Sequence, residues 1–243
     1  MVDTTDFIKA SFEVGRDFLR PPTGGGDAVP VARVAPIMVP IRSLGANHRS
    51  RIAKHLLALD DRDRYLRFGY LAKDAQIQRY VDSLDFERDE IFGIYNRRLE
   101  LIAMAHLANA KDGGYESCAE FGVSVLPFAR GRGYGARLFD RAAMHATNDG
   151  ISLMFIHALS ENVAMLTIAR NAGASVERDG PESEAHLRLP PATLDSRVTE
   201  MLEEQIAQAD YRLKVQAKQF WSFLATLQEV RRGVLDAQNR TPP

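Results

Sequence analysis

The residues best suited to chemistry lie in one stretch, from Ala119 to Gly135, with the sequence AEFGVSVLPFARGRGYG. Strand-like residues lead into a turn rich in glycine and arginine, and a good helix former, ARLFDRAAMHAT, follows at once. A strand, a loop of bare backbone amides and a helix N-terminus together form an anion cradle, because the amides point at the ligand and the helix dipole favours negative charge. This stretch therefore predicts a phosphate-binding site.

The loop has the pattern R-x-x-G-x-G, formed by Arg130, Gly131, Arg132, Gly133, Tyr134 and Gly135. Glycine suits a backbone that must approach a phosphate closely or adopt a positive φ. Arginine can add charge-assisted hydrogen bonds to phosphate oxygens. An ordinary basic surface turn is the competing interpretation. A P-loop is excluded, because no Lys-Ser/Thr pair follows the glycines, and a Rossmann motif fits less well.

Strand and helix patterns surround the loop. Apolar residues alternate with polar or small ones from Ala119 to Val125, which indicates a strand. Gly122 inside it marks either a bulge or a close approach of another group to the backbone. Downstream, Ser152 to Ala158 has the composition of a short buried strand, and in Leu159 to Ala174 a strand end with an asparagine is followed by an apolar helix that closes on glycine.

These segments resemble two motifs of the GNAT N-acetyltransferases. The R-x-x-G-x-G loop resembles the family's pyrophosphate-binding loop, and Asn162 with the helix ending at Gly173 resembles the motif beside the pantetheine arm. The wording ENxxMLxxAR, together with AEFGV before the loop, is closest to the GNAT domains of bacterial protein lysine acetyltransferases. The resemblance covers about residues 33 to 189. It implies an α/β fold with a mixed central sheet flanked by helices.

The resemblance also implies an acetyl-CoA site. Strand amides near Val123 would bind the pantetheine and polarise the thioester carbonyl. The cofactor-binding residues that it implies are Val123, Val125, Arg130, Gly131, Arg132, Gly133, Tyr134, Gly135 and Asn162. Two positions depart from the family: Ala169 replaces a tyrosine that often protonates the leaving thiolate, and Ala174 replaces an aromatic residue. The lysine-acetyltransferase branch lacks that tyrosine too, so the resemblance still implies an enzyme.

Glu120 is the predicted general base for direct acetyl transfer to an amine. A GNAT base on this strand acts directly or through a water, and partial burial would suit Glu120 to the role. The alternative is a solvated glutamate in a salt bridge, with Glu116 as the second candidate base. His157 is either an acid or substrate contact or an ordinary edge histidine. Cys118 is disfavoured as a nucleophile, because nothing beside it would lower its pKa.

The segment from Asp60 to Tyr70, DDRDRYLRFGY, has two interpretations. In GNAT folds this region forms a wall of the acceptor site, where its mixed charges would select an amine or a carboxylate. It could equally be a solvated turn in which Tyr65, Leu66 and Phe68 are buried.

Composition limits the remaining possibilities. The chain has 243 residues, 45% of them hydrophobic, and a net charge of −1, so nothing in its charge favours nucleic acid or an anionic membrane. A single cysteine rules out an intrachain disulfide, and the scattered histidines lack metal-ligand spacing, so we expect no metal. Without a long apolar run or a signal peptide, a cytoplasmic protein is expected.

The chain is predicted to have three parts. Residues 1–30 comprise an amphipathic helix (4–19), expected to dock on its own protein or on a partner, and a linker (21–30). Residues 31–190 form the GNAT domain, and residues 191–243 a long helix. Before the loop, the domain's expected elements are a strand (31–41), helices (47–59 and near 75–84) and a hairpin (91–95 with 99–105).

The C-terminal part has a heptad pattern. No glycine or proline occurs between Pro191 and Gly233, and apolar residues recur every seven positions at Ile206, Leu213, Phe220, Leu227 and Val234. A helix of about 40 residues would be roughly 60 Å long, longer than a domain of this size is wide. We therefore expect a coiled-coil-like helix that forms a homo-oligomer. A break near Asp210, giving a helical hairpin within one chain, is the alternative.

The sequence thus predicts an acetyl-CoA-dependent N-acetyltransferase acting on a small amine or a protein lysine. The rival hypothesis is a non-catalytic module of GNAT fold that binds acyl-CoA or serves in assembly. A different acyl donor, or a hydroxyl acceptor, is a third possibility.

Overall fold

The computed structural model describes residues 39–110 and 118–239. The expected N-terminal helix and linker, Glu116 and most of the expected strand at 31–41 lie outside these residues. Residues 39–41, the described end of that strand, are not extended in a sheet. The first strand instead comprises the two residues that follow, Arg42–Ser43.

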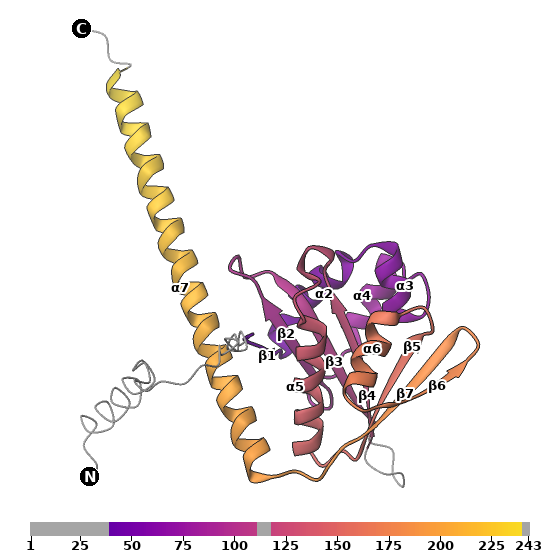
Figure 1. Ribbon diagram of the computed structural model, residues 1–243. Coiled ribbons are helices and arrows are strands. Elements are labelled where there is room, and N and C mark those ends of the chain that lie inside the picture. Colours follow the sequence, from indigo (N-terminus) through magenta and orange to yellow (C-terminus); the bar gives the residue numbers. More distant parts are fainter. Residues whose placement is uncertain (1–38, 111–117, 240–243) are drawn as a thin grey trace, which may run out of the picture. The chain divides into compact units, whose positions relative to one another are not determined.

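Seven strands of the described chain form one sheet in the order β1-β2-β3-β4-β5-β7-β6 (Figure 1). Neighbouring strands are antiparallel except β4 and β5, which are parallel. This mixed sheet confirms the predicted α/β class. The strands are β1 Arg42–Ser43, β2 Glu90–Tyr95, β3 Leu101–Ala110, β4 Cys118–Val125, β5 Leu153–Leu159, β6 Ser175–Asp179 and β7 Glu182–Arg188.

The helices match the predicted order with one addition. They are α2 Arg49–Leu57, α3 Asp61–Phe68, α4 Asp74–Asp82, α5 Tyr134–Asn148, α6 Val163–Asn171 and α7 Leu194–Asn239, with 3₁₀ turns at Ala46–His48 and Pro127–Ala129. The addition is α3, within the segment expected to be a turn or a wall. Asp60 caps its first turn by accepting from the Asp63 amide, and Gly69 ends it with φ 78°.

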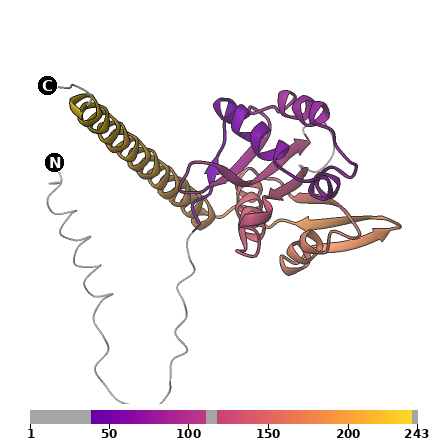
Figure 2. The same ribbon diagram turned by 90° about the horizontal axis from the view of Figure 1, so that it is seen from above.

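Helices cover both faces of the sheet (Figure 2). On one face, α2 and α4 pack over β3, with Ile52, Ile77 and Met104 fully buried. On the other face, α5 packs over β2, β3 and β4 around Phe121 and Phe139. Because side chains alternate along a strand, β2 and β3 supply both cores.

The sheet opens between β4 and β5. Their pairing covers only Cys118 to Glu120 against Leu153 to Phe155, although both strands continue further. The register of β4 with β3 is regular along its whole length, so Gly122 is not a bulge. Gly122 instead makes a close approach: a Cβ there would lie 2.7 Å from the guanidinium of Arg67. The backbone of β4 beyond Glu120 is thus left without a partner strand on the β5 side.

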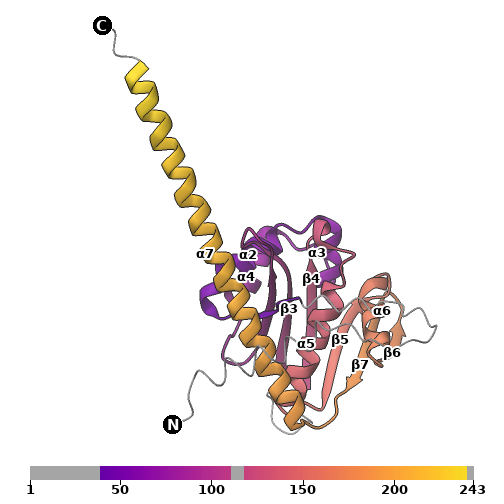
Figure 3. The same ribbon diagram turned by 60° about the vertical axis from the view of Figure 1, so that its left-hand side comes forward.

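The long C-terminal helix is confirmed as an uninterrupted α7 of 46 residues (Figure 3). The alternative of a break near Asp210 is therefore wrong, and Asp210 instead pairs with Lys214 one turn later. The first half of α7 packs on α5 and β1, where Ala207 is fully buried. None of the helices in the described ranges has the length and apolarity that a membrane span requires.

Candidate active site

Two adjoining cavities lie where β4 and β5 separate. The loop cavity, of about 520 Å³, is lined by the glycine-rich loop and the start of α5. The strand cavity, of about 610 Å³, is lined by β4, β5 and the β6–β7 hairpin. The residues that line both are Leu66, Arg67, Val123, Asn162 and Met165. The two cavities therefore form one continuous cleft that passes Val123.

The loop cavity has the features of an anion site. Gly131 and Gly133 have φ of 74° and 75°, which residues with a side chain rarely adopt. Gly133 is the N-cap of α5 and offers no side-chain cap, so the first amides of the helix are free to bind an anion. Gly135 allows close packing on α6, since its Cβ would lie 3.1 Å from Ile168 Cδ1. These residues fit the pyrophosphate and pantetheine of a coenzyme A thioester.

The two loop arginines have different surroundings. Arg130 lines the loop cavity, forms an ion pair with Asp63 of α3, and donates from Nε to the Val125 carbonyl at 3.2 Å. Its charge is therefore already balanced. Arg132 is exposed and does not line the cavity. The structure brings together the other residues predicted to bind the cofactor: Val123, Val125, Gly131, Gly133, Tyr134, Gly135 and Asn162.

Asn162 connects the two sides of the cleft. It is the N-cap of α6, where its Oδ1 accepts from the Met165 amide at 3.2 Å. Its Nδ2 lies 3.4 Å from the Leu66 carbonyl of α3. The α6 residue Ala169, where many relatives carry tyrosine, is fully buried and lines neither cavity.

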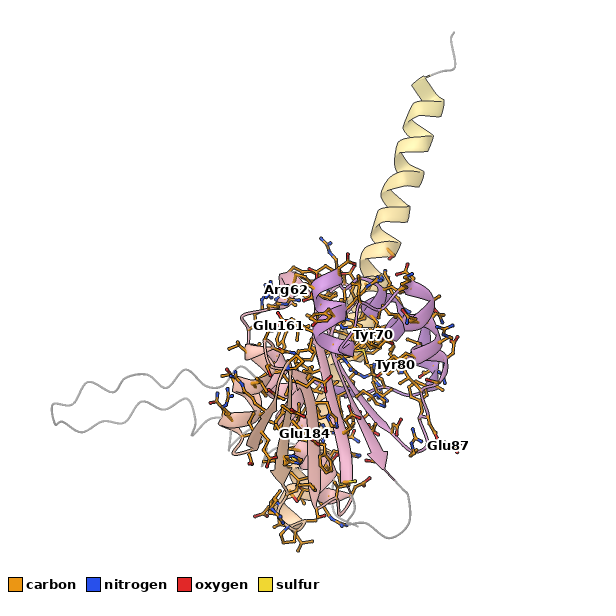
Figure 4. The ribbon with its side chains drawn as sticks, turned by 90° about the vertical axis from the view of Figure 1, so that its right-hand side faces the viewer. Arg62, Tyr70, Tyr80, Glu87, Glu161 and Glu184 are labelled. Atoms are coloured by element: carbon orange, nitrogen blue, oxygen red, sulfur yellow. The ribbon has the colours of Figure 1, made fainter. Side chains whose placement is uncertain are left out.

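The strand cavity is acidic. Its lining includes five carboxylates: Glu120, Glu177, Asp179, Glu182 and Glu184. In the β6–β7 register Glu177 lies opposite Glu184, and Asp179 opposite Glu182. Like charges in directly opposite positions destabilise a sheet. His157 also lines this cavity, with its Nε2 3.9 Å from the Glu184 carboxylate. Figure 4 looks onto this side of the sheet, with Glu184 labelled on the strands.

Glu120, the predicted general base, lines the strand cavity and is exposed rather than partly buried. It belongs to the segment of β4 that still pairs with β5, two residues before Gly122. Cys118 is half-buried at the start of β4 and lines neither cavity. Among the described residues, no group of three or more His, Cys, Asp or Glu side chains could hold a metal ion.

A chain of half-buried and buried polar groups, not foreseen from the sequence, extends from the cleft along the face of the sheet that α4 covers. Arg67 donates to the Tyr80 hydroxyl at 3.1 Å, and this hydroxyl lies 2.7 Å from His106 Nδ1. His106 Nε2 lies 3.0 Å from Asp89, which Arg88 also holds through two hydrogen bonds. Little in the sequence indicates that these polar groups meet, because they come from α3, α4, β3 and the turn before β2.

Burial determines the protonation of this chain. Burial lowers the pKa of His106, although the Asp89 carboxylate opposes the shift, so the imidazole is neutral near pH 7. Burial likewise raises the pKa of Tyr80, against the effect of Arg67. Because His106 Nε2–H donates to Asp89, His106 Nδ1 carries no hydrogen and accepts a hydrogen bond from the Tyr80 hydroxyl. The Tyr80 oxygen is then the acceptor for Arg67.

A buried histidine of α2, His55, braces the same face of β4 one position pair further along, at Ser124. His55 lies 2.9 Å from the Leu101 carbonyl through Nδ1 and 2.9 Å from Ser124 Oγ through Nε2. Burial lowers the pKa of His55 to about 4, so the ring is neutral. Its Nδ1–H donates to the carbonyl, and the Ser124 hydroxyl donates to Nε2. This pair ties α2 to β3 and β4 behind the loop cavity.

Solved structures similar to this chain share its fold. The GNAT domain of PAT from S. lividans is 19% identical, with a TM-score of 0.53 over 64% of this chain and 96% of that chain. The phosphinothricin acetyltransferase from Sinorhizobium meliloti, in complex with acetyl-CoA, is 14% identical (TM-score 0.52, 65% and 95% covered). The spermidine N-acetyltransferase from Vibrio cholerae, in complex with CoA and spermine, is also 14% identical (0.50, 62% and 95%).

Sequence comparison gives the family. No curated protein matches this chain. Residues 55–173, which extend from α2 to the glycine that ends α6, match the model of the Acetyltransferase (GNAT) family. Both motifs on which the resemblance was based fall within this range, and the described sheet opens beside them. The part of the chain that forms the cleft therefore belongs to the GNAT acetyltransferase family, as its motifs predicted.

Proposed function

We propose that this protein transfers the acetyl group of acetyl-CoA directly to a primary amine, either of a small molecule or of a protein lysine. The observation that carries the proposal is the continuity of the cleft from the glycine-rich loop to Glu120. A ligand held in both cavities would pass Val123, on the unpaired part of β4. The solved relatives in complex with acetyl-CoA, or with CoA and spermine, support this choice of ligands.

In this proposal, the loop cavity holds the coenzyme. The first amides of α5 and the loop glycines bind the pyrophosphate, and Asn162 lies beside the pantetheine. Unpaired amides of β4 near Val123 donate hydrogen bonds to the carbonyl oxygen of the thioester and stabilise the charge that develops on it. In this arrangement the acetyl carbon would lie at the junction of the two cavities.

The strand cavity holds the acceptor. Its five carboxylates attract an ammonium group and disfavour an anionic acceptor. Glu120 removes the ammonium proton, directly or through a water, so that the free amine can attack. In the β6–β7 hairpin, the repulsion between carboxylates that face each other becomes weaker when a cation lies between them. This supports an amine over a hydroxyl acceptor.

A screen of free amines, amino acids and lysine peptides, with release of the CoA thiol as the readout, tests this proposal. We expect acetyl-CoA-dependent thiol release with one class of cationic acceptor, and loss of that release in Glu120→Gln. Binding of acetyl-CoA without transfer to any acceptor would favour the alternative, a non-catalytic acyl-CoA-binding or assembly module. The alternative gains its support from Ala169, which provides no proton for the leaving thiolate.

We also propose that α7 associates with α7 of a second copy of this chain. The first half of the helix carries apolar side chains that are each more than 60% exposed: Leu194, Val198, Met201, Leu202 and Leu213. Leu213 lies at a position of the heptad pattern, which continues beyond it in the sequence. The same helix in a second copy is a partner that matches both its length and its apolar spacing.

A further inference from the structure

We infer that Arg67 is a catalytic residue of the proposed transfer: its guanidinium stabilises the negative charge on the leaving CoA sulfur. This inference rests on the proposed function. It assigns to a residue of α3 the task that many relatives give to the tyrosine replaced here by Ala169. No proton donor is required, because a guanidinium stays charged and acts by electrostatics alone.

The position of Arg67 is the first argument. Arg67 is one of the few residues that line both cavities, so it lies where a thioester would pass from the coenzyme to the acceptor side. Its guanidinium lies against the backbone of β4 at Gly122, next to Val123. Only the absence of a side chain at Gly122 leaves room for it there.

The charge of Arg67 is the second argument. Arg130, which lies on the coenzyme side of the cleft, forms an ion pair with Asp63, so its charge is balanced. Arg67 has no carboxylate within ion-pair distance among the described residues, and its one hydrogen bond goes to the neutral Tyr80 hydroxyl. A partly buried cation without an anion is costly. An anion formed in the cleft would remove that cost.

The Tyr80–His106–Asp89 chain positions the guanidinium. Because the Tyr80 hydroxyl donates its hydrogen bond to His106, its oxygen can only accept a hydrogen bond from Arg67. The rings of Phe68 and Tyr80 also lie 5.3 and 5.7 Å from Arg67 Cζ, which adds cation–π attraction. Tyr80 is therefore a positioning residue. It leaves four of the five N–H donors of Arg67 for a ligand.

The step balances without another reactant. The amine nitrogen attacks the thioester carbon and forms the C–N bond, while the carbonyl electron pair moves to oxygen. Collapse of this intermediate breaks the C–S bond, and the electron pair leaves with sulfur as a thiolate paired with Arg67. Glu120 passes the ammonium proton, taken before the attack, to solvent, and then takes the second proton from the nitrogen of the intermediate and passes it on in the same way. The thiolate takes its proton from water after release.

The binding of free CoA tests the inference directly. Arg67 should lower the pKa of the bound thiol, so the affinity for CoA should rise with pH relative to that for desulfo-CoA, which lacks the sulfur. We expect the ratio of the two affinities to rise about tenfold or more from neutral to alkaline pH, equivalent to a shift of about one pKa unit. In Arg67→Gln the ratio should be independent of pH over the same range.

Kinetics provide the second readout. Arg67→Ala should lower kcat more than it raises the KM for acetyl-CoA, and added guanidinium ion, far below denaturing concentrations, should restore part of the lost kcat. Arg67→Lys, which keeps the charge, should retain more activity than Arg67→Gln. Tyr80→Phe should show a smaller loss of kcat. Arg62→Ala is the matched control, because Arg62 lies on the same helix, is exposed and lines neither cavity (Figure 4).

The outcomes separate this inference from the proposed function. Wild-type protein that binds CoA and releases thiol, but whose CoA to desulfo-CoA affinity ratio does not change with pH, would overturn the role of Arg67 and leave the proposed function intact. Wild-type protein that does not bind CoA would overturn both. Circular dichroism of each variant checks that it is folded.

Discussion

Gly122 lies beneath the guanidinium of Arg67, so closely that a Cβ on Gly122 would approach Cζ and both Nη atoms to 2.7 Å. Such a contact is shorter than folded proteins tolerate, so one of the two groups would have to move. The glycine in the middle of β4 is thus explained by a side chain from α3 rather than by a turn or a bulge in the strand. This relationship places a cation on the only stretch of β4 that lacks a partner strand on one side.

The first prediction follows from this contact. Gly122→Ala should displace Arg67 and lower kcat severalfold, with a smaller effect on coenzyme affinity. Gly45→Ala is the matched control, since its new Cβ would meet only Asn47 Oδ1 at 3.6 Å. Steady-state kinetics decide the matter. Wild-type kcat in Gly122→Ala would mean that the position of Arg67 does not matter for turnover.

The second prediction concerns Glu120. Glu120→Gln should lower kcat by about 10²- to 10⁴-fold, the usual cost of losing a general base, and leave the affinity for acetyl-CoA nearly unchanged. Glu161→Gln, an exposed glutamate outside both cavities, is the control. If Glu120→Gln keeps its turnover across the pH range, Glu120 is structural and Glu116 is the next residue to test.

The third prediction concerns the loop. Replacing Gly133 and Gly135 with bulky residues should abolish acetyl-CoA binding, because Gly133 needs φ of 75° and Gly135 has Ile168 3.1 Å from its Cβ position. Gly150→Ala is the control: it carries similar strain, with φ of 77°, at the other end of α5. Calorimetry should show loss of binding only in the loop variant. Unchanged affinity would remove the loop from the site.

The fourth prediction concerns the attachment of α7 to α5. Burial lowers the pKa of His145, but the hydrogen bond with Glu200 at 2.7 Å raises it overall. A raised pKa means that this stabilisation is complete below the ordinary value of 6.5 and is lost as pH rises through the folded-state pKa. Burial would raise the pKa of Glu200, but hydrogen bonds with His145 and Asn148 lower it to about 2. That stabilisation is present above 4.5 and is lost as pH falls to about 2.

The free energy of unfolding should therefore be highest between these limits and fall on both sides. Urea unfolding followed by circular dichroism measures it. Glu200→Gln should lower the maximum and flatten the dependence on pH, since Arg141, only 3% exposed, also loses the nearer of its two ionic partners, at 2.9 Å, and keeps Glu204 at 3.5 Å. Glu203→Gln is the control, because Glu203 lies in the same helix and forms no ion pair with any of the described residues. A Glu200→Gln profile identical to wild type would contradict the assignment.

The fifth prediction concerns self-association. Truncation after Lys218 should convert an oligomer to a monomer, while the contacts of α7 with the domain, which include Tyr211 against Arg42 and Lys214 with the Tyr95 carbonyl, remain. Leu213→Glu should weaken association without truncation, because Leu213 is exposed at a heptad position. Sedimentation velocity measures both. A full-length protein that is monomeric at micromolar concentration would rule out the oligomer.

Local sequence was enough to predict the stretch from β4 to α5 and the length of α7. In β4, apolar side chains that enter one core alternate with polar or small residues on the opposite face, so periodicity is visible in the residues themselves. In the loop, positive φ can be met at low cost only by glycine, as at Gly131 and Gly133. In α7, the absence of glycine and proline between Pro191 and Gly233 left nothing to end the helix. Each of these features depends on residues close together in the chain.

Helix α3 and the partners of Arg67 could not be predicted in this way. Asp60 and Gly69 mark the ends of α3, but its eight residues are mostly charged and show no apolar stripe. Arg67 meets Gly122 across 55 positions of sequence, and Tyr80 meets His106 across 26. Where β4 parts from β5 is likewise decided by the strands and helices packed around them. These contacts join residues far apart in the chain, and only the packing of α3 and α4 against the sheet brings them together.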